Sequence, residues 1–343
     1  MFVVVTVIFF LFNVLPGDPA QMMLGQNEDA EQLAAVKAKY GFDQSIGTQY
    51  LYYLNDLSPI SIHSKSEENY TYLNPQKYSA STLFSLGNTD VALKFPYLRE
   101  SFTKQGKKVS AVLKETLPNT FVLAVSAIVI AMILGVILGI VSALKKDTWI
   151  DKSIQILSTL GMSVPSFFSA ILFAWLFGFV LHKYTNLEMT GSLYEVDDFG
   201  EFIRIRWKNL ILPALVLGIR PLAVVIQLMR NSLLEVFNQD YIRTARAKGL
   251  SEYQVIKKHA LKNAMNPVIT AISGWFASML TGAVFVEYVF GWNGLGKEIV
   301  NALNTLDLPV IMGAVLVIAI MFIIINIFVD IIYAWLDPKV KLQ

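Results

Sequence analysis

The 343-residue chain contains no cysteine, only three histidines and little charge, since Asp, Glu, Lys and Arg together make up 16% of it. Without cysteine it can form no disulfide, thiolate metal site or thiol nucleophile. His63, His182 and His259 stand too far apart for a local metal-ligand pair, and no metal site is expected. A net charge of +2 gives no electrostatic footprint for nucleic acid. This scarcity of charge, with an apolar fraction of 55%, indicates a membrane protein.

Long stretches without acidic or basic residues divide the chain. About 20 apolar residues cross a hydrocarbon core of about 30 Å, so each long stretch is a candidate transmembrane helix. Five stretches are uncharged and a sixth contains only Arg220; they are residues 1–17, 116–144, 153–182, 209–229, 263–286 and 308–329. We predict an all-α membrane protein with six transmembrane helices. Its parts are a first helix (1–17), an external region (18–113), a five-helix core (114–336) and a cytoplasmic tail (337–343).

The positions of Lys and Arg in the short connections predict the orientation, because the cytoplasmic side carries the excess. With the long region 18–113 outside, twelve basic residues lie inside and five lie outside. The inside residues are Lys145, Lys146, Lys152, Arg230, Arg243, Arg246, Lys248, Lys257, Lys258, Lys262, Lys339 and Lys341; the outside residues are Lys183, Arg204, Arg206, Lys208 and Lys297. Both termini are therefore expected in the cytoplasm.

The first apolar stretch is short for a span and has no basic flank before it. A signal peptide is the rival interpretation, but a positive leading region and a small-residue cleavage site are both missing. We expect a first transmembrane helix whose start precedes this chain.

The inside connection at 230–266 is too regular and too amphipathic for a tether. Gly249 supplies a position that commonly ends a helix, so one short helix is expected before it. Ser251 and Gln254 have the spacing of a capping box, which predicts a second helix over 252–259. The second helix would present Tyr253, Val255 and Ile256. Such a helix fits a groove in a partner, and its lysines would equally favour anionic lipid.

Residues 240–251, DYIRTARAKGLS, followed by HALKNA at 259–264 and Pro267, resemble the cytoplasmic signature loop of binding-protein-dependent ABC transporter permeases. The loop is most similar to that of the B-type subunit of the dipeptide and oligopeptide class. The general motif begins Glu-Ala-Ala, where this chain has RTA at 243–245, as in the peptide subfamily. Further matches follow in order along the chain: LPGDP at 15–19, YGFDQ at 40–44, SVPSFF at 163–168, LPA at 212–214, VFGW at 289–292, GLG at 294–296, and Asn326, Asp330, Tyr333, Asp337 and Pro338.

The resemblance implies the architecture of type I ABC importer permeases and a set of partners. These are a homologous second permease subunit, two ATPase subunits and an external solute-binding protein, at the bacterial cytoplasmic (inner) membrane. ATP and Mg would be bound by the ATPase subunits, with no cofactor in this chain. The resemblance assigns coupling to the ATPase to Arg243, Thr244, Ala245, Gly249, Ser251, Glu252, Tyr253, Val255 and Ile256.

Two segments depart from the family pattern. A Ser-, Tyr- and Asn-rich insertion lies near 55–84, where the family usually has a short link, and residues 187–191 replace a Leu-Pro turn.

The segment 291–298, GWNGLGKE, has the spacing of a phosphate-binding loop but ends in Glu298 instead of Ser or Thr. The hydroxyl that would bind magnesium is absent, and the carboxylate would repel a nucleotide. We interpret this segment as an external re-entrant turn.

Arg220 lies about eleven residues into its span, where an arginine costs about 3 kcal/mol on insertion scales, so it should face protein or water. Pro221 disrupts the helix locally, and freed carbonyls in a wet cavity could bind substrate amides. Arg220 is a pathway candidate, with pairing to a carbonyl or a partner subunit as the alternative, unless the depth assigned to the span is wrong.

Gly135 and Gly139 allow close helix approach, which favours packing within the subunit over a dimer seam. Glu287 and Asp330 lie at span ends, where solvated or capping roles are expected.

Three functions remain for such a chain. The first is the permease subunit of an ATP-driven importer of peptides or similar small solutes, which is not itself an enzyme. The alternative is an ion-coupled secondary transporter or channel, which needs ionisable groups that these spans lack apart from Arg220. The third is a membrane enzyme, for which no catalytic dyad or H-E-x-x-H motif is present. The substrate stays open, since related permeases carry peptides, nickel, haem or glutathione.

Overall fold

The computed structural model describes residues 2–13, 20–21, 29–67, 69–75, 77–104, 106–196 and 203–336. The motif at 15–19, the tail 337–343 and the side chain of Asp330 lie outside the described parts. The chain forms two compact units: unit 1 is Met1–Glu115 with Ile299–Ala319, and unit 2 is Thr116–Glu298 with Ile320–Gln343.

Among the described residues of unit 1, the helices α1 (Phe2–Asn13), α3 (Ala30–Tyr40) and α4 (Ile46–Leu57) precede the sheet. The side chain of Asp29 accepts a hydrogen bond from the Glu31 N–H at the start of α3, and Ser45 caps α4 in the same manner through Thr48. The core of this unit joins side chains of α1, α4 and the first turns of α15 (Leu308–Leu336). Its buried members are Val5, Ile8, Phe9, Tyr53, Met312 and Leu316.

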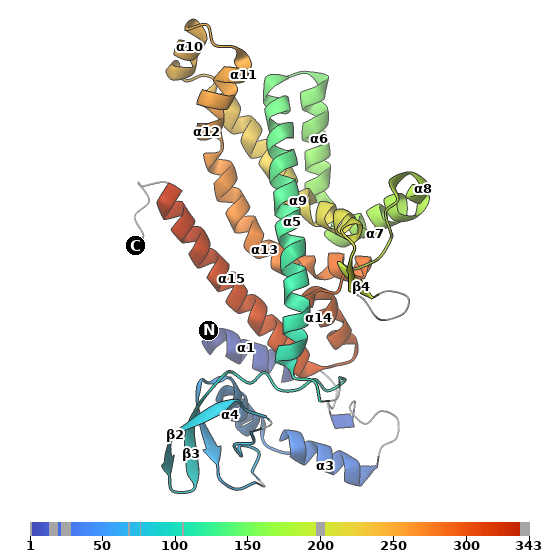
Figure 1. Cartoon of the computed structure of the whole chain (residues 1–343), viewed down its shortest axis with the longest axis vertical. Coiled ribbons are helices and arrows are strands. Elements are labelled where there is room, and N and C mark those ends of the chain that lie inside the picture. Colours follow the sequence, from blue (N-terminus) through green and yellow to red (C-terminus); the bar gives the residue numbers. More distant parts are fainter. Residues whose placement is uncertain are drawn as a thin grey trace. The chain divides into compact units, whose positions relative to one another are not determined.

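A three-stranded antiparallel sheet lies within the predicted external region. It consists of β1 (Ile60–Ser64), β2 (Ala80–Leu86) and β3 (Thr89–Lys94) in the order β1-β3-β2 (Figure 1). Gly87 has a φ of 56° in the two-residue turn between β2 and β3, a conformation that favours glycine. Unit 2 adds a two-stranded sheet of β4 (Tyr194–Val196) and β5 (Ile203–Ile205). The chain is mostly helical, but the prediction of an all-α protein is wrong.

Long helices form unit 2, and α9 contacts α6, α7 and α13 within it (Figure 1). Apolar clusters around Leu217 and around Met229 fill the space between these helices. The helices that lie wholly or partly in this unit are α5 (Val109–Leu144), α6 (Trp149–Ser163), α7 (Ser166–Phe173), the π-helical Ala174–Val180, α8 (His182–Thr185), α9 (Lys208–Val236), α10 (Asp240–Ala247), α11 (Glu252–Val255), the π-helical Ile256–Ala260, α12 (Leu261–Ala264), α13 (Asn266–Phe290), α14 (Leu295–Asn304) and α15 (Leu308–Leu336).

Among the described residues, three helices are long and apolar enough to cross a membrane: α5, α9 and α15. Two bent helix pairs raise the number to five, if each pair is counted as one span. The helix α1, with 12 residues, is shorter than the ~20 residues that a complete span needs. A count of six therefore stays a prediction.

The predicted span at 153–182 is not one continuous helix. α6 ends at Ser163 and the next helix begins at Ser166, with a bend of 111° between Trp149–Ser163 and Ser166–Val180. Pro165 has no N–H to donate to the backbone hydrogen bonds of a helix. Its ring also disfavours helical φ and ψ angles at the preceding residue. Val164 accordingly has an extended backbone, with φ −81° and ψ 133°.

The two glycines of α5 lie directly against α9. A Cβ atom added at Gly135 would come within 2.5 Å of Val225 Cγ1, and one at Gly139 would come within 2.6 Å of Met229 Cβ. Both contacts lie within one chain, so the prediction that these glycines serve packing inside the subunit is confirmed.

We expect Gly139→Ala to lower the stability of unit 2, because the new methyl group overlaps Met229. Overpacking of this kind typically costs about 1–3 kcal/mol, which a thermal unfolding curve of the detergent-solubilised chain would report as a lower midpoint. Gly274→Ala is the matched control, since its Cβ would meet no atom within 4 Å. Equal midpoints for the two variants would contradict the packing role of Gly139.

Candidate functional site

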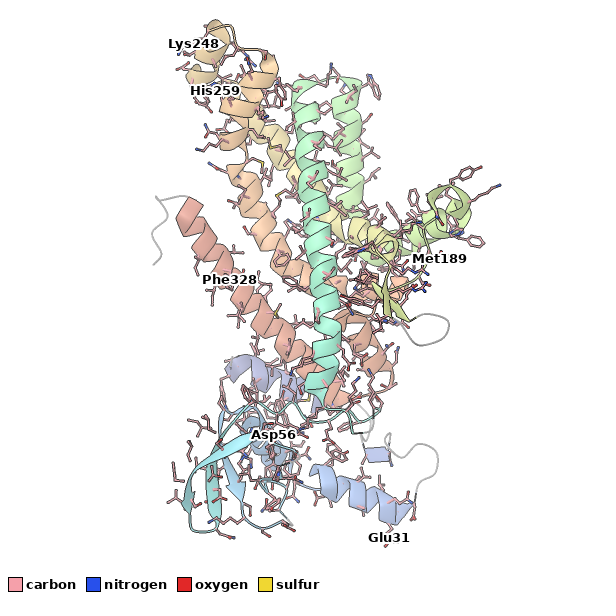
Figure 2. All side chains as sticks on the ribbon, in the orientation of Figure 1. Glu31, Asp56, Met189, Lys248, His259 and Phe328 are labelled. Carbon is pink, nitrogen blue, oxygen red and sulfur yellow. The ribbon has the colours of Figure 1, made fainter. Side chains whose placement is uncertain are left out.

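Short helical segments form the connection between α9 and α13. α10 precedes Gly249, and α11 continues through the π-helical Ile256–Ala260 into α12. The two predicted helices, one on each side of Gly249, are confirmed. Figure 2 labels Lys248 and His259 in this connection between α9 and α13.

Local sequence explains where these helices stop and start. Gly249 has a φ of 79°, and a Cβ there would meet no atom within 4 Å, so backbone conformation alone requires glycine. At the start of α11 the predicted capping box is confirmed: Ser251 accepts from the backbone of Gln254, whose side chain accepts from the Ser251 N–H at 3.2 Å.

One face of these helices is buried. Ile242, Ala245 and Val255 belong to the apolar cluster that contains Met229 of α9. Ala245 and Val255, both expected to contact an ATPase, therefore stabilise the loop from inside. The prediction that Val255 is presented to a partner is wrong, because this side chain is fully buried.

The opposite face is exposed and basic. Within it Arg246 pairs with Glu252 at 2.9 Å and Arg243 pairs with Asp240 at 3.5 Å. Lys248, Lys257 and Lys258 form no ion pair in the described parts of the chain. The Tyr253 side chain also lies on this face. We call this the outer face of the loop: Arg243, Thr244, Arg246, Ala247, Lys248, Gly249, Ser251, Glu252, Tyr253, Gln254, Lys257 and Lys258.

A buried ion pair connects the start of α6 with the end of α9, and the sequence analysis missed it. Arg230 donates from Nε to Asp151 Oδ1 at 2.8 Å and from Nη2 to Oδ2 at 2.7 Å. Asp151 also accepts from Ser142 Oγ at 2.5 Å and from the Asp147 N–H at 2.9 Å. Both charges stand at predicted cytoplasmic ends of spans, and this shared position is the signal that could have indicated the pair.

Arg220 lies beside a small cavity of about 80 Å³ within unit 2. Ser166 and Ser169 of α7, Ser278 of α13 and Pro221 also line it. Arg220 is exposed, and its guanidinium forms no hydrogen bond or ion pair with any described residue. Pairing with a carbonyl is therefore not observed within the described residues of this chain. Pro221 removes the helical N–H that the carbonyl of the cavity-lining Leu217 would otherwise receive.

The segment that has the spacing of a phosphate loop is a turn held by the protein itself. The fully buried Glu287 accepts through Oε2 from the N–H groups of Gly296 at 2.6 Å and Lys297 at 3.2 Å. Lys297 Nζ donates to the Gly291 carbonyl at 3.0 Å. The backbone donors and the lysine that would hold a phosphate are thus already hydrogen bonded. The predicted turn is confirmed, and Glu287 caps α14 instead of being solvated.

The chain matches a family described as binding-protein-dependent transport system inner membrane component over residues 135–342, and its N-terminal counterpart over residues 1–67. A protein of Brucella suis biovar 1 (strain 1330), described as a peptide permease, is 35% identical over 336 residues, which cover 97% of this chain and 92% of that protein. The chain belongs to the family of binding-protein-dependent transport system inner membrane components. The resemblance found in the sequence is thereby confirmed.

Other permeases of known name support the same assignment. The dipeptide transport system permease protein DppB of Bacillus subtilis (strain 168) is 32% identical over 341 residues, covering 99% of this chain and 94% of that protein. The fold of this permease is shared with the inward-facing MetNI methionine ABC transporter, with a TM-score of 0.51 and 15% identity over 66% of this chain and 97% of that one. The curated relatives and the family model together identify the chain as a peptide ABC transporter permease family member, and the solved structure shows a shared fold.

We expect Gly249→Ala in this permease to distort the loop without creating a clash. A non-glycine residue in the left-handed region costs about 1–2 kcal/mol, so the chain between α10 and α11 should open more often. Hydrogen exchange at the amides of 248–252 would measure this as faster exchange. Gly274→Ala again serves as the control, and unchanged exchange in Gly249→Ala would contradict the requirement for glycine.

Proposed function

We propose that this chain is the membrane-spanning subunit of an ATP-driven importer for dipeptides, oligopeptides or similar small solutes. The outer face of the loop carries this proposal. It is a basic surface supported by a buried apolar cluster and located between the long helices α9 and α13. The names of the relatives support the peptide substrate.

The proposed partners supply ATP hydrolysis, delivery of the solute and the second half of the pathway. Two ATPase subunits bind ATP and Mg and dock on the outer face of the loop, where Lys248, Lys257 and Lys258 favour an acidic cleft. An external binding protein delivers the solute. A homologous second permease subunit completes the pathway. ATP hydrolysis can move this bundle only through contacts that differ between its inward- and outward-facing states.

The proposed topology has six spans at a bacterial inner membrane, with α1 as part of the first span, residues 18–113 outside and both termini in the cytoplasm. The number of candidate spans, the family and the excess of lysine and arginine in the predicted inside connections support it.

We expect Tyr253→Ala to weaken docking of the ATPase subunits without affecting the fold. The Tyr253 side chain is 68% exposed on the outer face, and loss of an aromatic hot-spot residue typically costs about 2 kcal/mol or more of binding free energy. Copurification of the ATPase subunits with the tagged chain should fall at least about tenfold, and peptide uptake should fall with it.

Two variants separate docking from stability. Tyr184→Ala changes a tyrosine that is 83% exposed on α8 and should leave copurification intact. Val255→Ala should lower the unfolding temperature, because burial of a valine side chain contributes about 2 kcal/mol. Full ATPase recovery with Tyr253→Ala would argue against the docking face. Uptake that persists with ATPase subunits unable to hydrolyse ATP would favour an ion-coupled transporter.

We expect Arg220→Ala to slow peptide uptake by about tenfold, which corresponds to about 1.4 kcal/mol, while ATPase copurification stays normal. The charge of Arg220 has no partner among the described residues and borders a cavity lined by serines, so it is available to a passing solute. Gln227→Ala, two turns further along α9 and outside the cavity, is the matched control. Unchanged uptake rate and substrate range in Arg220→Ala would remove this residue from the pathway.

A further inference from the structure

Unit 1 contains a second, larger hollow of about 450 Å³. This volume lies within the range of small-molecule sites, roughly 300–1,000 Å³. The end of α3, the turn after it, the segment between β1 and β2, and residues 97–102 surround the hollow. Its aromatic lining consists of Tyr40, Phe42, Tyr70, Tyr72, Tyr97 and Phe102.

The aromatic rings of one group are already in contact with one another. The ring centroids of Tyr40 and Phe42 lie 5.9 Å apart, those of Tyr40 and Phe102 lie 5.5 Å apart, and those of Phe42 and Phe102 lie 5.7 Å apart. These three rings form an apolar wall that could receive an aliphatic or aromatic group, since aromatic pairs hold one another in fixed edge and stacked arrangements.

One carboxylate neutralises part of the positive charge beside the hollow. The fully buried Asp56, labelled in Figure 2, accepts from Arg99 Nε at 3.0 Å and from the hydroxyl of Tyr78 at 2.8 Å. Arg99 has a φ of 67°, a strained conformation that persists only where surrounding contacts fix it. The positive charge of Arg99 is therefore already paired with the Asp56 carboxylate.

Lys77 has no such carboxylate. Its Nζ lies 4.0 Å from the ring centroid of Tyr70, 5.0 Å from that of Tyr78 and 5.4 Å from that of Tyr97. No carboxylate of the described residues lies within ion-pair distance of this Nζ. Burial lowers the pKa of Lys77 below its usual value, because the charged form loses hydration, and the attraction of the more distant Asp56 and Glu100 carboxylates does not offset this loss. An anion bound beside Lys77 would restore the lost stabilisation.

Negative charge also borders the hollow. Glu67 and Glu100 line it, and neither forms an ion pair with the described residues. Tyr72 donates to Glu67 at 3.4 Å, which orients that carboxylate. The hollow thus combines an unpaired ammonium, unpaired carboxylates and an apolar aromatic wall.

We propose that this hollow binds a zwitterionic amino acid or short peptide with an apolar side chain. The ligand carboxylate pairs with Lys77, its ammonium group pairs with Glu67 or Glu100, and its side chain packs on the wall of Tyr40, Phe42 and Phe102. The site lies wholly within unit 1 and is separate from the cavity beside Arg220. It does not rest on the proposed transport function, because binding needs neither ATP nor a partner subunit.

Calorimetric titration of the purified full-length chain in detergent, with the dipeptide Ala-Phe as the probe, tests this proposal. We expect saturable binding of one dipeptide in this hollow. The dissociation constant should rise at least about tenfold for Ala-Phe amide, which lacks the carboxylate, and for Lys77→Met, which keeps an unbranched apolar stem but removes the charge. Lys77→Arg should restore much of the affinity.

Two further variants locate the bound dipeptide. Lys65→Met is the matched control, because Lys65 lies outside the hollow and pairs with Asp90 at 3.5 Å. Lys65→Met should bind Ala-Phe normally. Arg220→Ala reports separately on binding in the proposed pathway, and the binding assigned to the hollow is the part that Lys77→Met removes and Arg220→Ala leaves in place. The proposal is overturned if Ala-Phe does not bind, if the amide binds equally well, or if Arg220→Ala abolishes binding while Lys77→Met does not. The comparison of Ala-Phe with Ala-Phe amide uses the unmodified chain, so it still tests the proposal if a variant fails to fold.

Discussion

The close approach of α5 to α9 is the constraint on which unit 2 depends. Gly135 and Gly139 have no side chains, so Val225 and Met229 lie almost against the backbone of α5. α9 in turn contacts α6, α7, α12 and α13, and its Met229 extends the apolar cluster to the short helices of the loop. Van der Waals packing of this kind drives helix association where lipid removes the hydrophobic driving force.

The helix α9 connects the two proposed sites of unit 2. Arg220 and Arg230 are ten residues apart on one helix, or about 15 Å at 1.5 Å per residue. Arg230 is fixed to α6 through Asp151, and beyond it the loop packs on the same helix through Ile242, Ala245 and Val255. A displacement at the proposed docking face would therefore reach α9 through these three buried side chains.

The parts of this fold that depend on local composition could be predicted from the sequence. Uncharged runs mark the long helices, and the helix ends at Gly249 and Ser251 follow from backbone conformation and capping within a few residues. The break at Pro165 could not be predicted, because Pro118, Pro213 and Pro221 lie inside unbroken helices. Only the packing around each proline decides between these outcomes. The burial of Val255 and the exposure of its neighbour Tyr253 depend likewise on which face meets α9.

The sheet of unit 1 escaped prediction for a different reason, because its burial pattern is inverted. In β1, Ile60 and Ile62 are exposed, whereas Ser61 and His63 are buried. A prediction from alternating hydrophobicity places the apolar side chains in the core, so it would orient such a strand with the wrong face inward or miss the strand altogether.

The inversion follows from what the interior of unit 1 contains. His63 is hydrogen bonded through Nδ1 with the Thr71 carbonyl at 2.9 Å and through Nε2 with Ser61 Oγ at 2.8 Å, and Lys94 donates to the backbone of Asp56. Buried polar groups are tolerated when each has its partners, and such a network then fixes one arrangement of the core. Among the charges gathered near Asp56, Lys77 is left with aromatic rings in place of a carboxylate, and it borders the hollow. The polar interior of unit 1 therefore has two consequences. It makes the strands unrecognisable by hydrophobic periodicity, and it leaves the Lys77 ammonium without a carboxylate partner at the edge of the hollow, where a small anionic group can reach it.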